Sequence, residues 1–113
     1  MPTSPATTPG AGTSQQEQLT PLYNVVLLDD DDHTYEYVVE MLGALFFLSP
    51  DTAFQKAVEV DTTGRTIVMT CERKQAEFGR DQIHAYGPDW RMPKSKGSMR
   101  AIIEPAHGKP EVP

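Results

Sequence analysis

The sequence predicts an α+β fold of order β-α-α-β-α-β, in which three helices pack on one side of a three-stranded antiparallel sheet. Two observations predict it. Short stretches rich in aliphatic and β-branched residues, at 23–28, 65–70 and 98–104, are typical of strands. Between them lie segments whose apolar residues recur at spacings of three and four, the period of a helix buried on one face.

The chain has 113 residues, enough for one domain. Residues 1–20 consist mainly of Pro, Thr, Ser, Gln, Gly and Ala and lack the large apolar residues that offset chain entropy, so we expect a disordered tail. We expect residues 21–106 to fold and residues 107–113 to fray. A domain of this size builds one modest core, so ligands should bind in a shallow surface pocket.

The first strand, 23–28, is aliphatic nearly throughout and leads into four consecutive aspartates. The helix that follows is expected over residues 34–47, with Asp32 or His33 as its N-cap. Its buried face is marked by Tyr35, Val38, Leu42, Leu45 and Phe46.

The second helix has a clear start at Ser49-Pro50-Asp51. Serine accepts a free backbone N–H, proline at the first helical position loses no hydrogen bond, and aspartate complements the helix dipole. We expect the helix to end near Val60, before a turn at 61–64. One apolar face would be formed by Ala53, Phe54, Ala57 and Val58.

The remaining elements are the strand at 65–70, a helix at about 72–86 and the strand at 98–104. Gly87-Pro88 stops the helix, and a loop with one tryptophan and several basic residues extends to Gly97.

Charge and composition exclude several classes of function. A net charge of −6 argues against nucleic acid or an anionic membrane as the main partner. The single cysteine, Cys71, cannot form an internal disulfide and fits a reducing cytoplasm. We see no signal peptide and no transmembrane stretch, because the longest apolar run is 44–48. No motif calls for a cofactor, and we expect a monomer.

The aspartates at 29–32 are the candidate functional residues. One carboxylate can cap a helix, and the others need solvent, a metal ion or a cationic partner. The run lacks the spacing and the glycine turn of an EF-hand, which disfavours a metal. We favour a cationic partner, the α-amino group of a peptide, while a solvated acidic loop remains the alternative.

At this point the sequence resembles the ClpS family of bacterial and plastid adaptor proteins, over about residues 22–106. The resemblance is carried by Tyr23-Asn-Val-Val-Leu-Leu, Asp30-Asp31, Glu36-Tyr-Val-Val-Glu-Met-Leu42, the turn ending at Gly64, Tyr86 and Ile103-Glu104. It implies an adaptor rather than an enzyme. Such an adaptor binds N-degrons, peptides with a bulky apolar first residue such as Leu, Phe, Tyr or Trp, and delivers them to a Clp-type AAA+ unfoldase and its protease.

The resemblance also implies which residues form the site. The family's α-amino ligands fall on Asp29, Asp30, Asp31 and Asp61, and its pocket positions fall on His33, Tyr35, Val38, Val60 and Met99. Docking positions on the third helix fall on Lys74 and Gly79, and Trp90 and Arg91 offer a further docking surface. The chain departs from the family at Asp29, Asp61 and Tyr35, where the family has asparagine, histidine and methionine.

The chemistry of these residues supports the same function. A free α-amino group is a cation with three N–H donors, and each charge-assisted hydrogen bond to a carboxylate contributes about 1.5–3 kcal/mol. Burial of an apolar side chain adds about 1.5–3 kcal/mol, which after association entropy predicts micromolar binding. A module on this fold that binds another protein and has lost N-degron recognition is the main alternative. A small metal-dependent enzyme is a weaker one.

Overall fold

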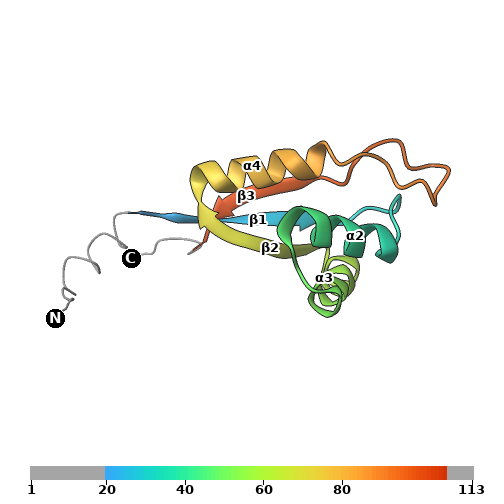
Figure 1. Cartoon of the computed structure of the whole chain (residues 1–113), viewed down its shortest axis with the longest axis horizontal. Coiled ribbons are helices and arrows are strands. Elements are labelled where there is room, and N and C mark those ends of the chain that lie inside the picture. Colours follow the sequence, from blue (N-terminus) through green and yellow to red (C-terminus); the bar gives the residue numbers. More distant parts are fainter. Residues whose placement is uncertain (1–19, 107–113) are drawn as a thin grey trace.

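The computed structural model describes residues 20–106, which contain three strands and three helices in the expected order (Figure 1). The expected disordered tail (all but Thr20) and the frayed C-terminal end lie outside the described residues. The elements are β1 (Leu22–Leu28), α2 (Tyr35–Phe46), α3 (Pro50–Thr63), β2 (Arg65–Glu72), α4 (Arg73–His84) and β3 (Ala101–Pro105).

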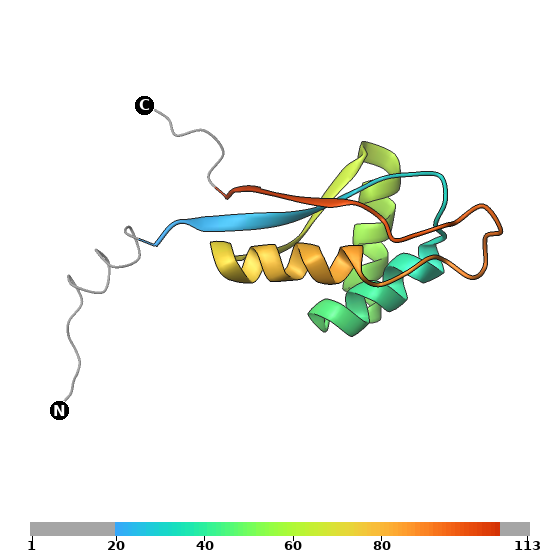
Figure 2. The same cartoon turned by 90° about the horizontal axis from the view of Figure 1, so that it is seen from above.

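The sheet has the order β2-β1-β3, and both pairs are antiparallel, as the sequence predicts. Because β1 lies in the centre, its Val25, Val26 and Leu27 are fully buried, which explains why this strand shows no polar alternation. The three helices lie on the same side of the sheet (Figure 2). On its other face Val26 is flanked by the partly exposed Ile67 and Ile102.

The core lies between the sheet and the helices. The sheet and the helices both contribute apolar side chains to it. The fully buried residues include Val25, Leu27, Met41, Leu42, Ala53, Ala57, Ala76 and Ile83. Helix α4 approaches α2 closely at Gly79, where an added Cβ would lie 3.1 Å from the ring of Phe46. A larger residue at Gly79 would push the two helices apart.

The expected start of α2 was wrong. Thr34, rather than Asp32 or His33, is the N-cap, and its side chain accepts a hydrogen bond from the Tyr37 backbone N–H at 3.1 Å. At the other end of α2, Phe47 adopts a left-handed conformation, with φ 58°, and 87% of it is exposed.

The expected end of α3 was also wrong, whereas its start at Ser49 is confirmed. The helix continues through the predicted turn to Thr63, and Gly64 closes it with φ 93°. The hydroxyl groups of Thr62 and Thr63 donate to the carbonyls of Val58 and Glu59, four residues earlier, so neither hydroxyl lacks a partner in this last turn.

The other boundaries shift by a few residues. Strand β2 runs two residues further than predicted, α4 is shorter than its predicted span, and β3 begins at Ala101 rather than residue 98.

The predicted apolar faces were wrong in part. In α3, Phe54 and Val58 are 50% and 36% exposed, and Val60 is buried instead. In α2, Tyr37 and Met41 are buried although the spacing did not predict them.

Candidate functional site

The candidate site is a small hollow at the end of β1. The Leu28 N–H donates to the Arg100 carbonyl at 2.9 Å, and the Asp29 N–H donates to the Gly64 carbonyl at 3.0 Å. These two bonds fix the start of the acidic run between the end of α3 and the chain that leads into β3. The first residues of α2 close the remaining side.

The hollow has a charged rim and an apolar floor. Its free volume is about 30 Å³, roughly the space of one water molecule in the liquid. The floor is buried, with Val38, Val60 and Met99 only 2–3% exposed. The full lining is Asp29, Asp30, His33, Thr34, Tyr35, Val38, Ala57, Val60, Asp61 and Met99.

Most of the residues predicted for the site therefore lie together, although they come from four segments. Asp31 is the exception, because it is exposed and does not line the hollow. Ala57 was missed as a lining residue. It precedes Asp61 by four residues on α3 and so lies on the same helix face, which is a signal that the sequence does contain.

The rim carries surplus negative charge. Partial burial raises the pKa of the Asp29 carboxyl above its usual value, and the nearby carboxylates of Asp61, Asp30 and Asp31 raise it further. Within residues 20–106 no lysine, arginine or histidine forms an ion pair with Asp29 or Asp61. This corner of the molecule therefore favours the approach of a cation.

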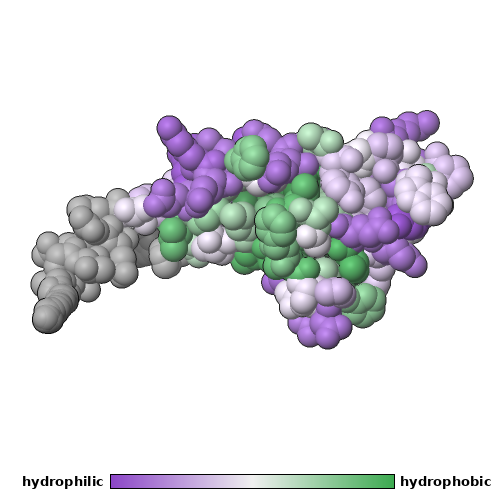
Figure 3. Space-filling view, in the orientation of Figure 1, coloured by the Kyte–Doolittle hydropathy of each residue, from purple (hydrophilic) through white to green (hydrophobic). Residues whose placement is uncertain are grey.

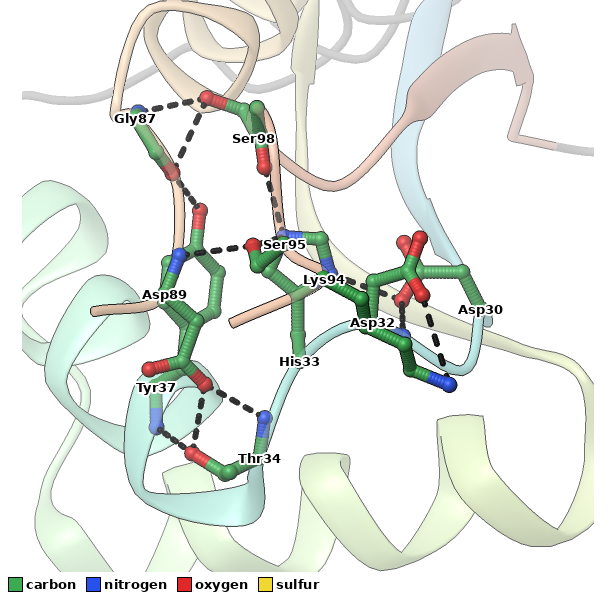
Figure 4. A network of polar contacts seen from close by, with 11 residues as sticks. Asp30, Asp32, His33, Thr34, Tyr37, Gly87, Asp89, Lys94, Ser95 and Ser98 are labelled. Carbon is green, nitrogen blue, oxygen red and sulfur yellow. Dashed lines mark hydrogen bonds and ion pairs between the residues drawn. The ribbon is translucent and has the colours of Figure 1, made fainter. Parts of the chain in front are cut away.

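Asp30, in contrast, is bound by other residues of the protein, although its side chain is 31% exposed. Its Oδ1 lies 2.7 Å from His33 Nδ1 and accepts from the Asp32 N–H at 2.9 Å. His33 Nε2 lies 2.7 Å from the Gly97 carbonyl, so the ring joins the acidic run to the 88–97 loop (Figure 4). The nearby Lys94 pairs with Asp32 at 3.7 Å. The His33 side chain, only 4% exposed, thus links two segments of the chain beside the hollow.

Tyr35 lines the hollow from the first residue of α2. Its hydroxyl donates to Asp61 Oδ2 at 2.5 Å, across the gap between α2 and α3. This hydrogen bond is the main reason why the pKa of Tyr35 is raised, so the phenol stays a donor at neutral pH. Its ring also meets Phe54 edge-on, with 5.7 Å between centroids. At about 30 Å³ the hollow is too small for a bulky side chain, so its lining must move before one can enter.

A buried aspartate far along the chain positions the start of α2. Asp89 Oδ2 accepts from the Thr34 N–H at 2.7 Å and from the Thr34 hydroxyl at 2.8 Å (Figure 4). Its Oδ1 accepts from Arg91, through the backbone N–H at 3.0 Å and the guanidinium at 3.1 Å. Asp89 was not predicted as a functional residue, because nothing local in the sequence distinguishes it from a solvated loop residue.

The residues predicted to dock the unfoldase do not form one surface. Lys74 is exposed in the first turn of α4, whereas Trp90 and Arg91 lie in the loop at the opposite end of the domain (Figure 1). Trp90 is 81% exposed, with the Arg91 guanidinium 4.6 Å from its ring centroid. Arg91 is largely committed to internal contacts, because it also binds Glu40 at 2.6 Å. Gly79 is buried against Phe46, so it offers a partner little surface of its own.

A larger apolar groove lies where α2, β2 and α4 meet. Figure 3 shows apolar surface gathered below α4, whose upper surface is hydrophilic. The groove has a free volume of about 300 Å³, and the most exposed of its aromatic residues are Phe47 and Phe78, at 87% and 64%. It is lined by Ala44, Leu45, Phe46, Phe47, Met69, Gln75, Phe78, Gly79 and Gln82.

Two further features bear on function. Along residues 20–106 no helix has the length and apolar character needed to span a membrane. In the same part of the chain, no three His, Cys, Asp or Glu side chains are placed to hold a metal ion together.

Comparison with known proteins identifies relatives of this chain. Residues 18–93 match the family model described as ATP-dependent Clp protease adaptor protein ClpS. The chain is 33% identical over 76 residues to ATP-dependent Clp protease adapter proteins ClpS of Synechococcus sp. and Synechococcus elongatus. These matches span 66% of this chain and 84% and 80% of the relatives.

A solved structure shows the same fold. Agrobacterium tumefaciens ClpS2 bound to L-phenylalaninamide matches with a TM-score of 0.66 and 29% identity, over 76% of this chain and 98% of that one. The family model covers more than half of the chain, and the fold agrees with it. The chain therefore belongs to the ClpS family of Clp protease adaptors and is an adaptor rather than an enzyme.

Proposed function

We propose that this adaptor binds the free α-amino group and the bulky apolar first side chain of N-degron peptides and delivers them to a Clp-type AAA+ unfoldase. One observation carries the proposal: the carboxylates of Asp29 and Asp61 lie without a cationic partner, among the described residues, on the rim of an apolar hollow. The first residue of a peptide has the two complementary features: a positively charged α-amino group for the carboxylates and, beside it, a side chain for the hollow.

The rim matches an ammonium group well. Asp29 and Asp61 offer acceptors from two sides, and Asp30 has one oxygen committed to His33 and the Asp32 backbone. An arriving cation would relieve the repulsion between these carboxylates and lower the raised pKa of Asp29. Binding should therefore weaken as the pH falls and Asp29 takes up a proton.

The apolar floor accounts for a preference for large first residues. Val38, Val60 and Met99 would contact the side chain, and its burial contributes about 1.5–3 kcal/mol. The Agrobacterium relative is bound to L-phenylalaninamide, which has a free amino group and an aromatic side chain. A ligand of that chemistry suits this rim and floor once Tyr35 moves aside.

Fluorescence anisotropy with Leu-, Phe-, Tyr- and Trp-initiated peptides tests the binding step. We expect micromolar affinity that acetylation of the amino group abolishes. Asp29→Ala should weaken binding at least tenfold. Asp31→Ala is the matched control: it removes the same charge two residues away, outside the hollow, and should change affinity less than twofold. Equal binding of acetylated and free peptides would refute the proposal.

The main alternative is a ClpS-fold module that has lost N-degron recognition and binds another protein. The small volume of the hollow favours this function, as does the hydrogen bond by which Tyr35 occupies an oxygen of Asp61. The same titrations separate the two functions, because the alternative predicts no binding of free-amine peptides by the folded protein.

Delivery requires a docking surface for the unfoldase. The groove between α2, β2 and α4, with the exposed Phe78, is an apolar surface beside the helix to which the resemblance assigns docking. Pull-down from lysate, with and without excess Leu-initiated dipeptide, should recover a Clp-type unfoldase. We expect Phe78→Glu to lose the unfoldase and keep peptide binding, and Trp90→Glu measures whether the distant loop contributes. A cytoplasmic location and a monomeric state remain expectations from the sequence.

A further inference from the structure

His33 is a buried histidine beside the hollow to which the proposed function gives no role of its own. Its Nδ1 lies 2.7 Å from Asp30 Oδ1, and its Nε2 lies 2.7 Å from the Gly97 carbonyl oxygen (Figure 4). A carboxylate and a carbonyl are both hydrogen-bond acceptors, so each ring nitrogen faces an acceptor. The ring therefore contacts the acidic run with one nitrogen and the 88–97 loop with the other.

Packing also holds the His33 ring in place. The side chain is 4% exposed, and the centroids of the His33 and Tyr37 rings lie 4.5 Å apart at an interplanar angle of 44°. Tyr37 is itself anchored, because its hydroxyl donates to the Gly87 carbonyl at 2.5 Å. Ser95 Oγ lies 3.2 Å from His33 Nε2, on the side of the loop. The imidazole thus has little room to turn, and its two nitrogen atoms keep their directions.

The fixed ring determines how the Asp30 carboxylate lies. Its Oδ1 is engaged from two sides, by His33 and by the Asp32 N–H at 2.9 Å. Its second oxygen, Oδ2, forms no hydrogen bond or ion pair within residues 20–106. Asp30 also lines the hollow. A mobile carboxylate would lose rotamer freedom when a ligand binds, whereas this one is already held and keeps an oxygen for a donor.

We propose that His33 is a positioning residue for peptide recognition, an inference that rests on the proposed function. Through Nδ1 it holds Asp30 so that the second carboxylate oxygen can accept from the α-amino group of the peptide. The contact of Nε2 with Gly97 has a different effect, because it holds the 88–97 loop against the acidic run. Only the first contact should matter directly for affinity.

Two amide variants separate these contacts. In His33→Asn the amide nitrogen takes the place of Nδ1, so it can donate to Asp30 but does not reach Gly97. In His33→Gln the amide nitrogen takes the place of Nε2, so it can donate to Gly97 but not to Asp30. Both variants lose the aromatic packing on Tyr37. A difference between them therefore shows which nitrogen supports binding.

Fluorescence anisotropy with a Leu-initiated peptide measures this difference. We expect His33→Asn, the variant that keeps the contact with Asp30, to bind no more than threefold more weakly than the natural protein. We expect His33→Gln to bind about five- to tenfold more weakly. Hydrogen exchange should show the opposite order, because the amides of residues 94–97 should exchange faster in His33→Asn and at the natural rate in His33→Gln.

The control is Glu40→Gln. It removes the ion pair with Arg91, which also joins α2 to the 88–97 loop, at 2.6 Å. Glu40 does not line the hollow, so the variant should change peptide affinity less than twofold. Thermal unfolding of each variant establishes that it folds.

A double-mutant cycle distinguishes positioning from a general loss of structure. In the Asp30→Ala background, His33→Gln should have no further effect on peptide affinity, because the carboxylate that His33 positions is absent. A purely structural role would lower the affinity equally in both backgrounds.

The role of His33 is overturned if His33→Gln binds the Leu-initiated peptide as tightly as His33→Asn does. It is equally overturned if the loss caused by His33→Gln persists in full in the Asp30→Ala background. Either result leaves the proposed function standing as long as acetylation still abolishes binding. If the natural protein binds acetylated and free peptides equally, the proposed function itself fails.

Discussion

Asp89 supports a quantitative prediction about stability. Its carboxylate is 1% exposed and receives four hydrogen bonds, two from Thr34 and two from Arg91. Burial alone would raise its pKa, but these hydrogen bonds lower the pKa to about 2 from an ordinary value of 3.8. A shift of that size corresponds to about 2 kcal/mol of unfolding free energy.

The lowered pKa determines how the contribution of Asp89 to the free energy of unfolding changes with pH. Above about pH 4 the carboxylate is ionised in both the folded and the unfolded chain, and its full contribution is present. The contribution is lost as the pH falls from about 4 through about 2, because the unfolded chain takes up the proton first. Asp89 should therefore account for part of the protein's acid sensitivity.

Asp89→Asn removes the charge and keeps the size of the side chain. The amide N–H₂ group is a donor and would face the donors of Thr34 or Arg91, which then lose their acceptor. We therefore expect the free energy of unfolding to fall by about 2–4 kcal/mol at pH 7. Urea unfolding followed by circular dichroism measures the loss. Repeated at pH 2.5, the difference between natural protein and variant should shrink by at least half.

The control is Asp81→Asn, at an exposed residue of α4 paired with Arg80, which should change stability by less than about 0.5 kcal/mol. A loss below about 1 kcal/mol for Asp89→Asn at pH 7, or a loss that does not depend on pH, would show that the carboxylate does not hold the start of α2 as described.

Three further predictions concern helix ends and the acidic run. Phe47→Gly should raise the unfolding free energy by about 0.5–1 kcal/mol, because it relieves a left-handed residue that buries little surface. Gly64→Ala, in the same conformation at the end of α3, should lower it by about 1 kcal/mol, and the same urea titrations compare the two. Asp30→Ala should weaken Leu-peptide binding at least tenfold by anisotropy and, by releasing His33, should increase hydrogen exchange at residues 94–97.

Local patterns predicted the fold well, because the determinants of each element are close in sequence. The aliphatic β1, the Ser49-Pro50 start of α3 and the apolar spacing of α2 each carry their own signal. The acidic run was recognised for the same reason, because it is contiguous and sits where a strand leads into a helix, whereas the residues around it were implied by the family resemblance.

The features that were missed depend on distant partners. Thr34 caps α2 with the help of Asp89, 55 residues away, so the local choice between Asp32 and His33 could not succeed. The hydrogen bond between Tyr35 and Asp61 spans 26 residues. Arg91 was predicted as a free docking residue, yet Glu40 and Asp89 engage it from two sides.

The direction of the central strand has a practical consequence for work on this protein. Strand β1 begins at Leu22 and ends at Leu28, beside Asp29, so its seven residues separate the two ends by about 20 Å. A fluorophore, affinity tag or fused domain joined ahead of Thr20 would attach at the end remote from the carboxylates. Immobilising the adaptor by that end would leave its ligand face turned toward the solution.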